Sequence, residues 1–173
     1  HFRNEYVSST QKADEKITIF DEAQRCWNEK KLTQWMKKKT GITIKKSEPE
    51  SLIEIMNRHD DWCVIICLVG GGQEIHDGEA GLKEWFSSTI NKFQDWKIYL
   101  PSQIKSMSEY NLSEILDNYP EEDTKIQIND NLHLGVSARS FRSELVSEFI
   151  NNIINLDINK AINNLNLINN KYP

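Results

Sequence analysis

The sequence has few cysteines, no paired metal-ligand spacing and no long apolar run, and each absence excludes a class of protein. Three cysteines are an odd number, and two of them lie in one apolar run, which indicates reduced core thiols and not a disulfide scaffold. The four histidines have no Cys/His pairs at zinc spacing. No run approaches the roughly 20 apolar residues of a membrane helix, and no signal-peptide pattern occurs in the first residues. We therefore expect a cytoplasmic protein without a membrane segment.

An excess of positive charge is also lacking. Lys and Arg number 21 against 26 Asp and Glu, so the net charge of −5 gives no overall attraction to nucleic-acid phosphate. One lysine-rich stretch around Trp35 is the exception, and its members are Lys30, Lys31, Lys37, Lys38, Lys39, Lys45 and Lys46. This stretch is either a local nucleic-acid contact with the indole as a stacking platform or, as is commoner, a solvated helix face.

Strand and helix patterns alternate through most of the 173 residues, a length that suits one domain with its own core. The unbroken apolar run 62–69 lies between Asp-Asp and Gly-Gly-Gly, which predicts a strand buried on both faces. The alternation predicts an α/β fold with a mainly parallel sheet. The expected strands are 16–20, 62–69 and 96–100, and the expected helices are 28–39, 47–56 and 79–92.

The last third of the chain has a less regular pattern. A further strand is predicted at 132–136, and from Ser143 onward Ile and Leu keep helical spacing through an Asn-rich tail. Because Asn is a poor helix former, this tail needs a partner surface to stay ordered. We expect one lobe over residues 1–150 and a helical Asn/Ile-rich segment over 151–173.

Two adjacent carboxylates, Asp21 and Glu22, directly follow the first predicted strand. Parallel α/β sheets bind ligands beyond the carboxyl ends of their strands, which is where a nucleotide and its metal would lie. In phosphoryl transfer one carboxylate holds Mg²⁺ and a second group orients the attacking water, roles that suit Asp21 and Glu22 respectively. The alternative is that both acids cap the next helix, where the helix dipole favours negative charge.

Three more polar residues are candidates for the same site. Gln73 follows three glycines after the second strand, and an amide can accept from a water and donate to a phosphate oxygen. Arg139 and Arg142 suit the charge spread over a transferring phosphoryl group. The ordinary alternatives are a glycine-rich turn around Gln73 and surface ion pairs of the arginines with Glu144 or Glu148.

Four blocks of sequence carry a resemblance to a known family. They are Phe-Asp-Glu-Ala-Gln-Arg at 20–25, Ser-Glu-Pro-Glu at 47–50, Leu-Val-Gly-Gly-Gly-Gln-Glu-Ile-His-Asp-Gly-Glu-Ala-Gly-Leu-Lys-Glu-Trp at 68–85 and Leu-Gly-Val-Ser-Ala-Arg-Ser-Phe-Arg-Ser-Glu at 134–144. Together they resemble the Schlafen group 3-like ATPase/helicase family, which is similar to superfamily 1 DNA/RNA helicases. The resemblance implies a RecA-like P-loop NTPase fold, a three-layer α/β sandwich with a mainly parallel sheet.

The resemblance also implies roles for individual residues around the first strand. Asp-Glu-Ala-Gln corresponds to the Walker B box, with Asp21 on Mg²⁺ and Glu22 on the attacking water. Gln24 occupies the last position of that box, which links the bound nucleotide to the rest of the lobe.

Further along the chain, the resemblance makes Gln73 the γ-phosphate sensor of motif III. Arg139 lies in an Ala-Arg-Ser version of motif IV, which implies that it reaches the γ-phosphate, and Arg142 is a further nucleotide-binding candidate. Ala138 stands where the family usually has Tyr, so no stacking role is assigned there.

One family feature is absent from the 173 residues. The phosphate-binding loop Gly-x-x-x-x-Gly-Lys-Ser/Thr does not occur, and neither do motifs V and VI. Without the donors of that loop the triphosphate has no cradle, so we expect this chain alone to be inactive.

Two readings follow from this absence. We expect part of a first RecA-like lobe of an ATP-dependent helicase-like motor that works with Mg²⁺, ATP and nucleic acid. The N-terminal part of that lobe and a second RecA-like lobe would then lie elsewhere in a longer parent. The alternative is a non-catalytic nucleic-acid or protein binding module derived from an ATPase lobe.

Overall fold

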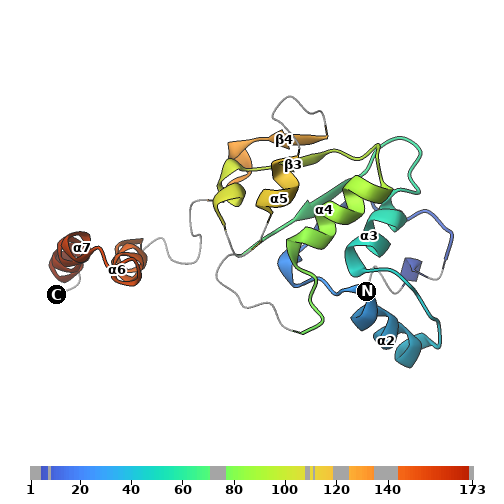
Figure 1. Cartoon of the computed structure of the whole chain (residues 1–173), viewed down its shortest axis with the longest axis horizontal. Coiled ribbons are helices and arrows are strands. Elements are labelled where there is room, and N and C mark those ends of the chain that lie inside the picture. The colour runs from blue at the N-terminus through green and yellow to red at the C-terminus, as the bar shows by residue number, and fades with distance from the viewer. Residues whose placement is uncertain are drawn as a thin grey trace. The chain divides into compact units, whose positions relative to one another are not determined.

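The computed structural model of the chain describes residues 5–7, 9–70, 77–107, 110, 112–118, 125–134 and 144–171. The chain divides into two compact units, His1–Leu132 and His133–Pro173. Strands and helices alternate in the first unit, and the second contains two helices (Figure 1). Residue 150, the predicted domain border, lies inside α6 (Glu144–Ile154).

The first unit contains two pairs of parallel strands, which confirms an α/β fold with parallel sheets. Strand β1 (Ile17–Phe20) pairs with β2 (Val64–Cys67), and β3 (Ile98–Leu100) pairs with β4 (Ile126–Ile128). Parallel neighbours need a crossover connection between them. Two helices lie between β1 and β2 in the chain, and the short α5 (Ser113–Leu116) lies between β3 and β4.

Two helices of the first unit begin at residues whose side chains cap them. Helix α2 (Glu29–Thr40) follows Asn28, whose side chain accepts a hydrogen bond from the backbone N–H of Lys31. Helix α3 (Glu48–Met56) follows Ser47, which caps the N–H of Glu50 in the same way. The remaining elements are α4 (Gly81–Lys92) and three short 3₁₀ helices, η1 (Ala23–Arg25), η2 (Ser102–Ser106) and η4 (Asp130–Leu132).

The core of this unit lies between the β1–β2 sheet and the two helices α3 and α4, which pack on each other (Figure 1). Phe20, Ile65 and Cys67 point from the sheet into this core. The Phe20 ring meets the Trp85 indole of α4 edge-on, with 5.3 Å between centroids. The core therefore covers one face of the sheet.

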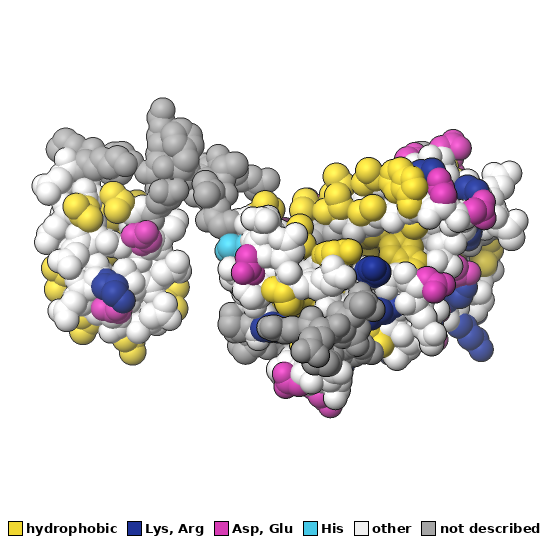
Figure 2. Space-filling model, turned by 90° about the horizontal axis from the view of Figure 1, so that it is seen from above, with side chains coloured by type: hydrophobic (Ala, Val, Ile, Leu, Met, Phe, Trp, Pro, Cys, Tyr) yellow, Lys and Arg dark blue, Asp and Glu magenta, His cyan; other side chains and the backbone are white. Residues whose placement is uncertain are grey.

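The other face of the β1–β2 sheet is exposed, so the prediction of a strand buried on both faces is wrong for this chain. We call it the open sheet face, and its members are Ile17, Ile19, Val64, Ile66 and Leu68. Ile19 at its centre keeps 63% of its surface exposed. Figure 2 shows hydrophobic side chains gathered along one side of this unit. Parallel sheets normally have both faces covered, so this one lacks a layer within the described residues.

Two predictions for the C-terminal third also need correction. The strand predicted at 132–136 is wrong at its start, because Leu132 ends η4, and 135–136 lie outside the described residues. The strand in this region is β4, which begins at Ile126, six residues before Leu132. The helix predicted from Ser143 is two helices that pack on each other, α6 and α7 (Ile158–Lys171). Leu156 separates them with a left-handed φ of 58°, which no helix can continue through.

Candidate functional site

The carboxyl ends of β1 and β2 are joined by backbone hydrogen bonds beyond the strands themselves. The N–H of Leu68 donates to the Phe20 carbonyl at 2.9 Å, and the N–H of Ala23 donates back to the Leu68 carbonyl at 2.9 Å. The turn that carries Asp21 and Glu22 therefore lies beside the end of β2. This is the edge of a parallel sheet at which ligands bind.

Glu22 has an unusual backbone conformation at this edge. Its φ of 54° and ψ of 47° are left-handed, which costs a residue with a side chain about 1–3 kcal/mol. The N–H of Glu22 donates to Asp21 Oδ1 at 3.0 Å, and its carbonyl accepts from the N–H of Arg25 at 2.9 Å. Its side chain makes no capping bond to η1, and Asn28 caps α2. Glu22 is thus the N-cap residue of η1 by position, without a side-chain capping bond, and the choice between capping and a phosphate site stays open.

Gln24 connects the two turns through its side chain. Only 1% of its surface is exposed, and its Nε2 donates to Glu22 Oε2 at 2.6 Å. Its Oε1 accepts the N–H of Gly70 at 3.3 Å. A Cβ built on Gly70 would lie 3.7 Å from the Glu22 carboxylate, so this turn and the acid are in direct contact range. Gln24 thus bridges Glu22 to the start of the glycine-rich turn.

Two aromatic side chains that the sequence did not single out support the same turns. Trp85 Nε1 donates to the Ala23 carbonyl at 2.9 Å, and the Tyr110 hydroxyl donates to the Gly70 carbonyl at 2.7 Å. Buried Trp and Tyr usually find a partner for their polar atom, so both residues are natural supports of a turn. The only sequence signal for either is that Trp85 ends the third block of the resemblance.

The far end of the glycine-rich segment is also anchored, at Gly78. The N–H of Asn28 donates to the Gly78 carbonyl at 2.9 Å. Gly78 has a φ of +84°, and an added Cβ would lie 2.7 Å from Lys31 Cδ, so glycine is required here for both conformation and space. Gly70 and Gly78, which lie on either side of 71–76, are thus bonded to Gln24 and to Asn28.

Three of the predicted site residues, Gln73, Arg139 and Arg142, lie outside the described residues. Their roles as phosphate sensor and phosphate ligands stay predictions. In the part of the chain that the structure describes, no group of three or more His, Cys, Asp or Glu could hold a metal. Mg²⁺ usually binds through one or two carboxylates and keeps several waters, a pattern that the exposed Asp21 beside Glu22 fits.

The three cysteines are free thiols, as predicted. Cys26 is fully buried and its Sγ lies 3.4 Å from the Gly81 carbonyl, a hydrogen-bond distance for sulfur. Burial raises the pKa of the Cys26 thiol, and it raises the pKa of Cys67 to about 12. Both therefore stay protonated at neutral pH and serve as packing residues.

The lysine-rich stretch is partly used within the fold. Lys31 Nζ lies 5.2 Å from the centre of the Trp27 ring, and Trp35 packs edge-on against Trp27 at 5.9 Å. Lys46 forms an ion pair with Glu54. Trp35 is half-buried, and its role as a stacking platform stays a prediction. The exposed lysines with no ion pair to any described residue are Lys30, Lys37, Lys38, Lys39 and Lys45.

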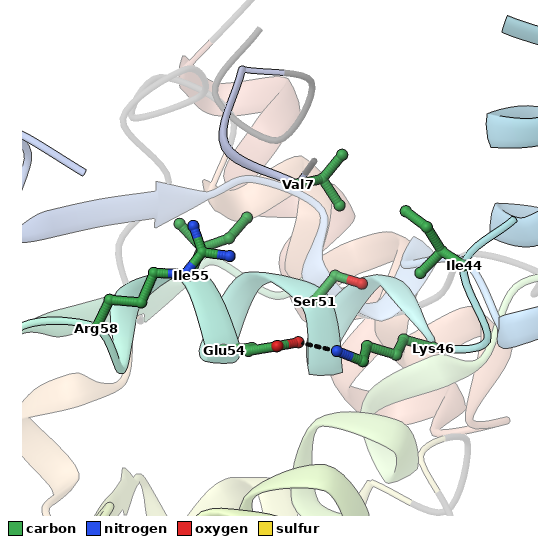
Figure 3. Close-up of a pocket in the computed structure, with 7 residues that line it drawn as sticks. All are labelled: Val7, Ile44, Lys46, Ser51, Glu54, Ile55 and Arg58. Atoms are coloured by element: carbon green, nitrogen blue, oxygen red, sulfur yellow. Dashed lines mark hydrogen bonds and ion pairs between the residues drawn. The ribbon is translucent and has the colours of Figure 1, made fainter. Parts of the chain in front are cut away.

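A small pocket lies elsewhere, between α3 and the N-terminal segment (Figure 3). Its lining residues are Val7, Ile44, Lys46, Ser51, Glu54, Ile55 and Arg58. The Lys46–Glu54 ion pair runs along it, and Arg58 Nη1 donates to the carbonyls of Tyr6 (3.1 Å) and Gln11 (2.9 Å). These bonds fasten the N-terminal segment to α3, and no residue of the predicted ATP site takes part.

One comparison with known proteins identifies a family. Residues 2–173 match the family model described as Schlafen group 3, DNA/RNA helicase domain. Comparison with curated proteins and with solved structures gave no match. None of the helices that the structure describes combines the length and the apolar composition that a bilayer crossing requires.

Proposed function

The chain belongs to the Schlafen group 3 DNA/RNA helicase-domain family, and from this premise we propose that it carries the metal- and water-binding half of an ATP site. Membership indicates helicase-like function and interaction with nucleic acid at the level of the family. The observation that supports an ATP site is the bridge from Glu22 through Gln24 to Gly70 at the carboxyl ends of two parallel strands. On this proposal the fold is a RecA-like P-loop NTPase lobe.

The described residues suit distinct tasks in ATP hydrolysis. Mg²⁺, when bound, would neutralise charge on the phosphate oxygens, and Asp21 would hold it through its water shell. Glu22 would accept a proton from the attacking water and orient it. The Gln24 amide, bonded to Glu22 Oε2 at 2.6 Å, fixes the direction of that carboxylate. We assign sensing of the γ-phosphate to Gln73, and neutralisation of its charge to Arg139 and Arg142.

The other half of the site must come from polypeptide outside these residues. The chain has no phosphate-binding loop, and the open sheet face leaves five apolar side chains uncovered. We propose that the element carrying this loop packs on the open sheet face, and that a second RecA-like lobe completes the motor. The free, protonated thiols are in keeping with a cytoplasmic setting.

The test is Glu22→Gln in the full-length protein. We expect ATP binding to persist, because the substitution keeps the size of the side chain and removes only the proton acceptor. Turnover should fall by about 100-fold or more. Glu29→Gln, an exposed glutamate in the first turn of α2, is the matched control and should change neither quantity. Full turnover by the Glu22 variant would remove that residue from its assigned role, and robust hydrolysis by residues 1–173 alone would contradict the split site.

A second candidate function, a nucleic-acid binding module, is favoured by the charge distribution. Residues 29–46 contain seven Lys and one Glu, a net charge of +6. Since the whole chain carries −5, the other residues sum to −11 (−5 minus +6). Such segregation creates a local attraction to phosphate backbones on an otherwise acidic protein. Salt-sensitive binding of an oligonucleotide by residues 1–173, without ATPase in the full-length protein, would favour this function over the motor.

A further inference from the structure

Tyr110 is a buried residue that the ATP-site assignment does not use. It lies in the chain between η2 and α5, and 6% of its surface is exposed. It belongs to the same hydrophobic cluster as Leu100 of β3 and Ile126 of β4. The same cluster includes Leu52 of α3 and Trp85 of α4, so the Tyr110 ring lies in the core that both sheets share.

The hydroxyl of Tyr110 points to the ATP-site side of the unit. It donates to the Gly70 carbonyl at 2.7 Å, across 40 residues of sequence. Gly70 is thus held at both of its backbone polar groups, by Gln24 at its N–H and by Tyr110 at its carbonyl. A continuous series of hydrogen bonds runs from the Glu22 carboxylate through Gln24 and Gly70 to the Tyr110 hydroxyl.

This series crosses a boundary in the fold. Among the described strands, β1 pairs with β2 and β3 pairs with β4, and no pairing joins the two sheets. The hydrogen bonds from Gln24 through Gly70 to Tyr110 therefore connect two sheets that share no backbone hydrogen-bond ladder. Because buried hydrogen-bonded networks fix the geometry of the groups they join, the link can hold the backbone of Gly70 in place after β2.

We propose that Tyr110 is a positioning residue for ATP hydrolysis, which holds the turn at Gly70 in register with Glu22 and couples it to the β3–β4 part of the lobe. The proposal rests on the ATP site proposed above. Gln73, the proposed sensor, follows Gly70 by three residues in the sequence. Tyr110 touches neither nucleotide nor metal in this role and acts through Gly70 and Gln24.

The test is Tyr110→Phe in the full-length protein, with Tyr99→Phe as the matched control. Phe keeps the ring that fills the core and removes only the hydroxyl. Tyr99 on β3 is 53% exposed, so its variant loses the same atom from the surface. In Tyr110→Phe we expect kcat for ATP to fall about three- to tenfold, the worth of one hydrogen bond, with KM unchanged. Amide exchange at residues 68–70 should rise by a similar factor, and Tyr99→Phe should match wild type in both measurements.

The two measurements separate failure of this proposal from failure of the proposed function. If the wild-type protein does not hydrolyse ATP, the ATP site is wrong and the positioning role with it, while exchange at residues 68–70 still reports whether Tyr110 holds the turn. If wild type is active and Tyr110→Phe keeps its kcat, the positioning role is overturned even where exchange rises. An equal loss of kcat in Tyr99→Phe would also overturn it. Only a selective fall in kcat with faster exchange at the turn supports it.

Discussion

The three thiols lie at different depths in the first unit, and depth determines their acidity. Cys67 points into the core from the end of β2, and burial raises its thiol pKa from the usual 9.0 to about 12. Cys63, outside that strand, is half-buried, and burial raises its pKa as well. A buried thiolate would lack water around its charge, so the folded state holds the proton more tightly than the unfolded state does.

The raised pKa makes stability depend on alkaline pH. Between pH 9 and 12 the folded state binds more protons at Cys67 than the unfolded state, so stability present below pH 9 is lost as pH rises toward 12. We expect wild type to lose about 1–2 kcal/mol more than Cys67→Ala between about pH 8 and about pH 10.5. Urea unfolding of residues 1–173 at the two pH values measures this. Cys63→Ala should differ less from wild type in this loss of stability. Equal differences for the two variants would contradict the deeper burial of Cys67.

At the residue scale, the predictable part of the site is the part that is contiguous in sequence. Asp21, Glu22 and Gln24 follow one strand within four residues, so strand and site could be predicted together. Trp85 and Tyr110 reach the site across 62 and 40 residues. Their hydrogen bonds depend on how α4 and the chain after η2 pack, which periodicity does not contain.

Helix α2 carries five lysines, of the 21 Lys and Arg in the chain. Its last turn contains Lys37, Lys38 and Lys39, all exposed and without an ion pair to a described residue. Three consecutive positions span about 200° around a helix, so these lysines spread around the end of α2 and can follow a flexible backbone. Changing all three to Gln should weaken binding of a single-stranded oligonucleotide. It should also reduce the magnitude of the slope of log K against log salt by about 2, because each lost phosphate contact contributes about 0.7 to that slope.

The control for this prediction removes the same charge from other surfaces. The control variant changes Lys83, Lys97 and Lys160 to Gln. Lys83 lies on α4, Lys97 lies just before β3, and Lys160 lies on α7. This variant should leave the salt slope unchanged. Filter binding or fluorescence anisotropy over a range of salt concentrations measures both triple variants. Equal losses of affinity would mean that net charge alone drives binding, and α2 would then have no special part.

Helices with capping signals and strands β1, β2 and β3 could be predicted closely, but strand β4 could not. Asn28 and Ser47 mark the starts of α2 and α3, and Gly41 ends α2 with a left-handed φ of 76°. Strand β4 has three residues, Ile-Gln-Ile, too few for periodicity to stand out from a loop. The break at Leu156 was equally hidden, because a left-handed leucine has no sequence signature.

At the scale of the whole molecule, the open sheet face contradicts the sequence pattern that forms it. The run Trp-Cys-Val-Ile-Ile-Cys-Leu-Val has no polar residue on either face, as in strands covered on both sides. The described chain covers one side of the sheet only. The apolar composition of β2 therefore suits a sheet whose second face is covered by further polypeptide. Ile17 and Ile19 on β1 extend the same face at 53% and 63% exposure.

This mismatch gives a prediction that compares two lengths of chain. If further polypeptide covers the open sheet face in the full-length protein, Ile19→Thr should destabilise that protein by about 1.5–3 kcal/mol, the cost of losing a buried aliphatic side chain. In residues 1–173 alone the same change should cost much less, because Ile19 is already 63% exposed there and Thr also suits a strand. Urea unfolding of both lengths gives the two values. Ile42→Thr, 40% exposed just after α2, should have a small effect in both. A small effect of Ile19→Thr in the full-length protein would mean that the face stays open, and the phosphate-binding element would then have to pack elsewhere.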